Sequence, residues 1–120
     1  MMNSARKAIE KLYKDRCSVI EKRNVTDPVT KKTDFEQVTV LENQPCKLSF
    51  SSFPSATDGN NATLSQAVKL FLSPDCSILP GSKIIVTQQN GTITEYSNSG
   101  KPAIYASHQE INLKLFERWA

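Results

Sequence analysis

The dipeptide Asn90-Gly91 constrains the fold of this chain more strongly than any other feature of its sequence. It separates two runs rich in β-branched and aromatic residues, 84–89 and 92–96. Asn and Gly tolerate the positive φ angles that a type I′ turn needs, and a two-residue loop between such runs predicts a tight β-hairpin. We therefore expect this hairpin at the centre of a small antiparallel sheet.

A two-residue loop also predicts how the two strands pair, because loop length sets the register of a hairpin. The expected register places Gln89 opposite Thr92, Val86 opposite Glu95, and Ile85 opposite Tyr96. A shift by one residue would move every side chain of a strand to the other face of the sheet. The register therefore decides which side chains enter the core.

Other short segments alternate between apolar and polar residues, as strands with one buried face do. They lie near Cys17 and Val19 and at residues 36–41, 46–51, 67–73, 103–106 and 110–119. The last segment also suits one face of a helix, because its apolar residues recur at helical spacing. Residues 24–33 are expected to form an exposed hairpin tip, and Asn43-Gln-Pro45 is expected to break the strand that follows.

One short helix is expected near the start of the chain. Ser4 is a suitable N-cap for a helix from Ala5 to about Asp15, with one apolar stripe formed by Ile9, Leu12 and Tyr13. Seven or eight short strands and one helix predict an all-β fold, a small antiparallel β-barrel or sandwich. The 120 residues contain no linker, so a single domain at residues 1–120 is expected.

Residues 51–66 depart from this pattern because they are small and polar, have no hydrophobic period, and carry one charge, that of Asp58. This composition predicts a long flexible loop, and loops of this length inside a compact domain are usually functional or disordered. Its candidate functional residues are Ser52, Phe53, Ser55, Thr57, Asp58, Gly59, Asn60 and Asn61.

The net charge of +3 is unevenly distributed. Residues 1–32 hold nine Lys or Arg and four Asp or Glu, whereas residues 33–120 hold six and eight. A basic segment on a slightly acidic body favours docking onto an anionic partner, either nucleic acid or an acidic protein face. The candidate docking residues, in a helical arm at residues 1–15, are Arg6, Lys7, Lys11 and Lys14. A solvated helix of mixed charge is the alternative interpretation.

Few residues favour catalysis or metal binding. His108 is the only histidine and no nucleophile-elbow motif is present, so we expect it to be bonded structurally at the start of the last strand. Cys17, Cys46 and Cys76 lack C-x-x-C spacing and favour free thiols, with a disulfide or metal pair as the alternative. The sequence therefore predicts no catalytic or metal site, no cofactor and no enzyme.

Membrane segments are not expected either. No apolar run approaches the roughly 18 residues of a membrane span. No apolar h-region follows the basic N-terminal residues, so a signal peptide is not expected.

Several motifs taken together resemble the head–tail joining proteins of tailed bacteriophages, in the form found in PBSX-type prophages of Gram-positive bacteria. They are Cys46-Lys-Leu-Ser-Phe50, Val68-Lys-Leu-Phe-Leu72, Pro80-Gly-Ser-Lys-Ile84, Ser99-Gly-Lys-Pro-Ala-Ile-Tyr105, Ser107-His-Gln-Glu-Ile111 and Arg118-Trp-Ala120. The resemblance covers residues 12–120, and its Pro-Gly-Ser-Lys and His-Gln-Glu runs are specific when they occur together.

The resemblance implies a β-barrel subunit that forms a homo-oligomeric ring in the virion, between the portal–adaptor complex and the tail proteins. Assembly would take place in the cytoplasm of the bacterial host. In the head-completion or stopper branch of the family, the loop between the second and third core strands projects into the channel and holds packaged double-stranded DNA. In this chain that loop corresponds to residues 51–66. A segment with one acidic and no basic residues suits a channel for DNA, because cations would bind the passing phosphates.

Two other functions remain open from the sequence. A tail terminator or tail completion protein would use a related small β fold and a ring, but would bind the tail tube. A small β-barrel nucleic-acid-binding module would stack bases on exposed aromatic residues, for which Tyr96, Tyr105 and Phe116 are candidates.

Overall fold

The computed structural model describes residues 4–55 and 63–119 of the chain. It contains one short helix and seven strands. In chain order these are α1 (Ser4–Glu10), β1 (Asp15–Thr26), β2 (Thr33–Ser55), β3 (Thr63–Leu72), β4 (Lys83–Thr87), β5 (Ile93–Asn98), β6 (Ala103–Ile104) and β7 (Gln109–Leu115). The small all-β fold predicted from the sequence is confirmed.

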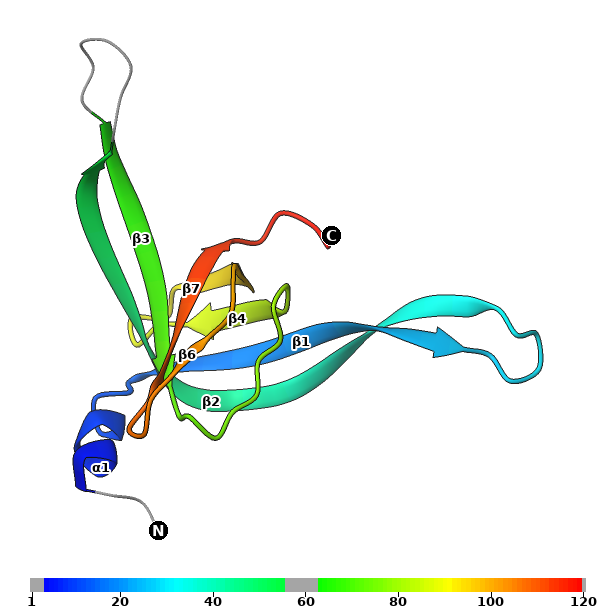
Figure 1. Cartoon of the computed structure of the whole chain (residues 1–120), viewed down its shortest axis with the longest axis horizontal. Coiled ribbons are helices and arrows are strands. Elements are labelled where there is room, and N and C mark those ends of the chain that lie inside the picture. Colours follow the sequence, from blue (N-terminus) through cyan, green and yellow to red (C-terminus); the bar gives the residue numbers. More distant parts are fainter. Residues whose placement is uncertain (1–3, 56–62, 120) are drawn as a thin grey trace.

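The strands form one antiparallel sheet that closes on itself (Figure 1). The order of neighbours is β3-β2-β1-β4-β5-β7-β6, and β3 also pairs with β7. Strand β7 therefore has β3 along one edge and β5 and β6 along the other. Closing a sheet in this way protects the backbone N–H and C=O groups that free edge strands would expose.

The core fills the inside of the closed sheet. Successive side chains of a strand point to opposite faces, so alternate residues are buried in those parts of β1, β2, β3, β4 and β7 that belong to the closed sheet. The buried cluster consists of Cys17, Val19, Cys46, Leu48, Leu70, Leu72, Ile78, Ile84, Val86, Tyr96, Ile111 and Leu113. Burying each larger aliphatic side chain is worth about 1.5–3 kcal/mol, so this cluster holds the closed part of the sheet together.

Two ribbons project from the closed sheet and make the molecule extended. The radius of gyration is 17.2 Å, whereas a compact chain of this length would have about 13.6 Å. The outer part of the β1–β2 hairpin forms one ribbon and the outer part of the β2–β3 hairpin forms the other (Figure 1). Both ribbons share β2, which has 23 residues.

The hairpin predicted at Asn90-Gly91 is present, but the predicted register is wrong by one residue. Tyr96 pairs with Ile84, whereas the sequence analysis paired it with Ile85. Cross-strand partners share a face of the sheet. The observed register therefore places the Tyr96 side chain inside the closed sheet, next to the buried Ile84.

The register differs because the loop of this hairpin has three residues. The Gly91 N–H donates to the Gln88 carbonyl, and the Gln88 N–H donates to the Thr92 carbonyl, both with N···O distances of 2.8 Å. Gly91 has a φ of +91°, and Asn90 is not among the described residues with positive φ. Such a loop is a type I turn followed by a residue in the left-handed region, and an Asn-Gly sequence suits it as well as a type I′ turn.

The helix and the first long hairpin also differ from the expected boundaries. Helix α1 ends at Glu10, short of the predicted end near Asp15, because Asp15 already pairs with Cys46 at the start of β1. The predicted break at Asn43-Gln-Pro45 is instead an irregularity within β2, where Asn43 has a φ of +52°. The hairpin tip is shorter than residues 24–33, since β1 continues to Thr26 and β2 begins at Thr33.

The C-terminal segment is a strand, as predicted, and not the helix that its spacing also allowed. Strand β7 ends at Leu115, earlier than the predicted end at Trp119. Phe116 continues the register of the β5–β7 pair by one position beyond the end of β7, since its N–H donates to the Glu95 carbonyl with an N···O distance of 3.0 Å. Phe116 and Trp119 make an edge-to-face contact with ring centroids 5.2 Å apart.

Candidate functional site

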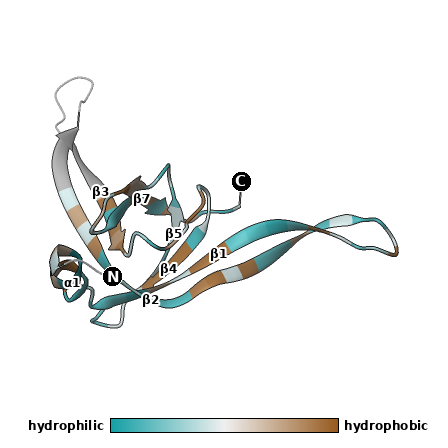
Figure 2. Ribbon diagram, turned by 60° about the horizontal axis from the view of Figure 1, so that its bottom comes forward, coloured by the Kyte–Doolittle hydropathy of each residue, from teal (hydrophilic) through white to brown (hydrophobic). Residues whose placement is uncertain are grey.

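The two ribbons and the N-terminal helix are the parts of the molecule that lie outside the closed sheet (Figure 1). We call residues 21–38 of the β1–β2 hairpin the arm. Residues 22–37 are all exposed, including the apolar side chains of Val25, Val29 and Phe35. Figure 2 shows hydrophobic bands on β2 where the ribbon leaves the closed sheet and mainly hydrophilic colours farther out, with a hydrophobic tip. A two-stranded ribbon without a buried face is only marginally stable in water, so the arm is suited to being covered by a partner.

The tip of the arm has a defined loop. The Lys31 N–H donates to the Asp27 carbonyl (N···O 2.8 Å), and Lys31 has a φ of +59°. The Asp27 carboxylate accepts hydrogen bonds from the N–H groups of Val29 and Thr30, and these bonds lower the pKa of Asp27. The loop leaves Val29 88% exposed at the end of the arm.

The two faces of the arm differ in charge. On one face the cross-strand pairs are Glu21 with Val38, Arg23 with Glu36, and Val25 with Asp34. Three carboxylates and one guanidinium lie on this face, which we call the acidic face of the arm. The opposite face holds a single charged residue, Lys22, whose ammonium nitrogen lies 4.3 Å from the centre of the Phe35 ring.

The second ribbon contains part of the segment that the sequence analysis assigned to a flexible loop. Ser52, Phe53 and Ser55 lie in β2, where they pair with Gln66, Ser65 and Thr63 of β3. The loop boundaries of 51 and 66 are therefore wrong. The β2–β3 register continues outwards without a shift, and backbone pairing of this kind does not need the hydrophobic alternation on which the prediction depended. The remaining candidates, Thr57, Asp58, Gly59, Asn60 and Asn61, lie outside the described residues.

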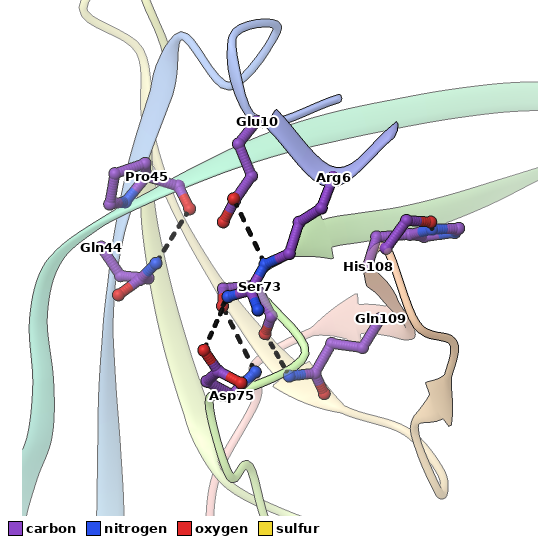
Figure 3. Close-up of polar contacts among 9 residues, drawn as sticks. Arg6, Glu10, Gln44, Pro45, Ser73, Asp75, His108 and Gln109 are labelled. Carbon is purple, nitrogen blue, oxygen red and sulfur yellow. Dashed lines mark hydrogen bonds and ion pairs between the residues drawn. The ribbon is translucent and has the colours of Figure 1, made fainter. Parts of the chain in front are cut away.

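Arg6, one of the four predicted docking residues, is held by its own chain. Its guanidinium lies 2.6 Å from an Asp75 carboxylate oxygen, 3.3 Å from a Glu10 carboxylate oxygen and 2.7 Å from the Ser73 hydroxyl (Figure 3). The hydrogen bond to Asp75 is the main cause that raises the pKa of Arg6. Arg6 therefore fastens α1 to the segment after β3, which the sequence could not reveal because Asp75 is 69 positions away.

The other predicted docking residues, Lys7, Lys11 and Lys14, are exposed. None of the three forms an ion pair with another described residue. Next to them lies a pocket of about 200 Å³ with mainly apolar walls. It is lined by Ile9, Leu12, Tyr13, Lys47, Phe71 and His108. We call this pocket, together with Lys7, Lys11 and Lys14, the basic pocket.

The side chain of Tyr13 forms the inner wall of the basic pocket. It is buried, and its hydroxyl has no hydrogen-bond partner among the described residues. Burial raises the pKa of Tyr13 to about 12. The hydroxyl thus stays protonated at neutral pH and faces a mostly apolar environment.

His108 lies directly before β7 and is bonded there, as the sequence analysis predicted. Its Nε2 lies 2.9 Å from a Glu110 carboxylate oxygen, and its Nδ1 lies 3.0 Å from the Ser107 hydroxyl. The imidazole stacks on Tyr105 with ring centroids 5.0 Å apart. The hydrogen bond with His108, followed by the contact with Lys69, lowers the pKa of Glu110.

Neighbouring Gln109 fixes the segment that carries Asp75. Its side-chain amide nitrogen donates to the Ser73 carbonyl at 2.7 Å (Figure 3). The same nitrogen donates to the Cys76 carbonyl at 2.6 Å. Gln109 is fully buried, so these two bonds replace water for both carbonyls. Sequence reasoning missed this role, although a Gln at a core-facing strand position is the kind of residue that needs a buried partner.

The three cysteines are free, as the sequence favoured. Cys17 and Cys46 are buried, and a hydrogen bond between their sulfur atoms and burial both raise the pKa of Cys46. Within residues 4–55 and 63–119, no group of three or more His, Cys, Asp or Glu side chains is arranged to hold a metal ion. The only described helix is too short to cross a membrane.

Comparison with known proteins gives one similar solved structure. The structure of the phage-like element PBSX protein xkdH from Bacillus subtilis matches with a TM-score of 0.53 at 12% sequence identity. The match covers 83% of this chain and 91% of that one. No protein-family model and no curated protein sequence matches this chain. At this level of identity the likeness concerns the fold.

Proposed function

We propose that this chain is a structural subunit of a phage head–tail connector, a head-completion or stopper protein that forms a ring in the virion. One face of the ring would bind the portal–adaptor complex and the other would bind tail proteins. The observation that carries the proposal is the combination of a fold shared with a PBSX phage protein and two ribbons that project from a small closed sheet. Ribbons with exposed backbone and apolar side chains suit contacts between subunits better than they suit a protein that works alone.

The β2–β3 ribbon is the part that we propose to face the DNA channel. It begins at a rigid position, because Cys46 and Leu48 of β2 are buried in the core. Residues 52–66 contain a single charge, that of Asp58, and no Lys or Arg. A ribbon of this composition can approach packaged double-stranded DNA without binding its phosphates strongly.

We propose a structural role rather than an enzymatic one, with other proteins and DNA as partners and without a cofactor. Ser107, His108 and Glu110 form a hydrogen-bonded chain next to the aromatic rings of Tyr105 and Phe71. In this proposal the hydrogen-bonded chain holds the segment before β7 in place.

Location is the first test of the proposal. Electron microscopy of phage particles carrying a labelled copy of this chain should find the label as a ring between head and tail. A label on the tail tube away from that junction would favour a tail terminator instead. Absence of the label from particles would refute both.

The second test concerns the channel. Deleting Asp58, Gly59, Asn60 and Asn61 should change the stability of the domain little, because the free energy of loop closure varies slowly with length. Heads that carry the deletion variant should lose packaged DNA before tails attach, whereas a variant with four Gly or Ser residues at these positions keeps the length and should retain it. Equal retention of DNA by the deletion variant and the full-length chain, at equal ring occupancy, would exclude this ribbon as the stopper.

A further inference from the structure

We propose that the acidic face of the arm docks onto the basic pocket of a second copy of this chain, so that successive copies associate head to tail. This contact deepens the proposed connector function and rests on it only for one step, the closure of associated copies into a ring. The acidic face of the arm and the basic pocket lie at different ends of the molecule.

The chemistry of the two surfaces matches. On the acidic face, Val25 is 44% exposed and lies beside Asp34, its cross-strand partner, and close to Glu36. Neither Asp34 nor Glu36 forms an ion pair with another described residue, since Arg23 on the same face is paired with Glu21 (2.8 Å). The Asp34 carboxylate accepts one hydrogen bond, from the Phe35 N–H at 2.8 Å. An apolar side chain and two carboxylates without an ion-pair partner among the described residues are therefore presented on one side of the arm.

The basic pocket offers the complement. Its walls are mainly apolar, and its volume of about 200 Å³ is larger than the isopropyl group of Val25. Lys47 lines the pocket, and Lys11 directly precedes the lining residue Leu12, while Lys7 lies on α1 itself. Leu12 is 58% exposed at the pocket, so its apolar surface also lacks a cover in the single chain. Opposite charges around an apolar contact fix the register of two surfaces and disfavour wrong partners.

The positions of the two surfaces require two molecules. The arm points away from the body on the side opposite to α1 (Figure 1). One copy therefore cannot place its own arm in its own basic pocket. Each copy instead has one arm for one neighbour and one pocket for another, which is a heterologous contact that forms a ring when the rotation between copies closes.

Nucleic acid, the other candidate partner, fits the basic pocket less well than a second copy does. Its phosphates would be attracted to Lys7, Lys11 and Lys14 but would make no favourable contact with the apolar walls. A second copy of the chain satisfies both the lysines and the apolar walls.

Mixed cross-linking of two cysteine variants tests the contact in the purified protein. Cys76→Ser serves as the common background, because Cys17 and Cys46 are buried. Val25→Cys is placed on one tagged protein and Leu12→Cys on a second protein with a different tag. After mixing at low salt and mild oxidation, we expect a disulfide-linked dimer that contains both tags. Thr87→Cys, which is exposed on β4 outside the arm and does not line the pocket, replaces Val25→Cys in the matched control and should give no such dimer.

Charge reversal tests the specificity of the same product. Adding Asp34→Lys and Glu36→Lys to the arm variant should reduce the initial rate of cross-linking by about tenfold, as expected for the loss of two partly exposed ion pairs. Adding Lys7→Glu and Lys11→Glu to the other protein should restore most of the rate. Circular dichroism spectra identical to those of the parent proteins would exclude unfolding as the cause of the loss.

The remaining outcomes overturn the inference. A dimer of Val25→Cys alone would mean that two arms meet in a symmetric contact, and absence of any mixed dimer would mean that the surfaces do not meet. These results are independent of the particle experiments. If cross-linking fails but the label is found between head and tail, only the contact is refuted. If cross-linking is efficient but the label is absent from particles, only the connector function is refuted.

Discussion

The loop at Gly91 allows a sharp test of the hairpin at the centre of the sheet. Gly91 has a φ of +91°, and a Cβ added to it would meet no atom within 4 Å. Gly91→Ala should therefore lower the free energy of unfolding because of the backbone conformation at this position, and not because of a steric clash. A non-glycine residue in the left-handed region costs about 1–2 kcal/mol, so we expect the free energy of unfolding to fall by that amount.

Two further variants isolate the cause. Asn90→Ala removes one exposed hydrogen bond, in which the Asn90 side-chain oxygen accepts from the Thr92 N–H at 3.0 Å, and it should cost only about 0.5 kcal/mol. Gly100→Ala is the matched control, because Gly100 lacks a positive φ and a Cβ there would also meet nothing within 4 Å. It should be neutral, or stabilising by up to about 1 kcal/mol through lower entropy of the unfolded chain.

Thermal unfolding followed by circular dichroism measures these differences. An unfolding entropy of about 2.1 cal/mol/K per residue gives roughly 0.25 kcal/mol/K for 120 residues. Gly91→Ala should therefore lower Tm by about 4–8 °C, and Gly91→Asn should lose less because Asn tolerates the left-handed region. In a two-residue type I′ loop both central residues would need positive φ. Equal losses from Asn90→Ala and Gly91→Ala would refute the three-residue loop and the register derived from it.

Three other predictions concern the attachment of α1 and the groups buried near it. Tyr13→Phe should leave stability at pH 7 unchanged or higher, since the buried hydroxyl has no hydrogen-bond partner among the described residues. The folded pKa of about 12 lies above the unfolded value of 10, so the wild type should lose stability as the pH rises from 10 towards 12, and the Phe variant should lose less of it in chemical denaturation. Gln109→Leu should lower the free energy of unfolding by about 2–4 kcal/mol, because it leaves the carbonyls of Ser73 and Cys76 without their donor; a loss below that of Gly91→Ala in the same denaturant titration would contradict this. Arg6→Ala should speed chymotrypsin cleavage after Leu12 and Tyr13 by releasing α1 from Asp75, while Lys7→Ala, on the exposed side, should not change the rate.

The sequence predicted those parts of the fold in which burial on one face leaves a visible period. The alternation of Cys46, Leu48 and Phe50 identified the inner part of β2, and that of Val68, Leu70 and Leu72 identified β3. The sequence pattern could not identify the outer ends of the same strands. A ribbon outside the core pairs through its backbone and needs no alternation of apolar and polar residues. The register of the β4–β5 hairpin was missed because an Asn-Gly sequence supports both two-residue and three-residue loops.

The candidate site was predictable to a smaller extent. Charge alone identified Lys7, Lys11 and Lys14 as exposed cations, and the structure agrees. The same criterion included Arg6, which binds Asp75 instead, and a contact between residues 69 positions apart has no local signal. The arm was recognised only as a hairpin tip, because its strands alternate in charge between two solvent-exposed faces and neither face has the hydrophobic period of a core strand.

The distribution of apolar residues connects the fold with the proposed assembly. Hydrophobic residues make up 38% of the chain, which is low for a globular domain, and the structure divides them into a buried set and an exposed set. The buried set fills the closed sheet, where Leu70, Ile84 and Ile111 are fully buried. The exposed set includes Leu12 after α1 and Val25 and Val29 on the arm, and it also has members on the body of the sheet, such as Ile93. Because the closed sheet is complete without the exposed set, those residues do not contribute to the core and are available for contact with another molecule. In the proposed assembly, Val25 and Leu12 would become covered when copies associate, whereas the closed sheet would form without them.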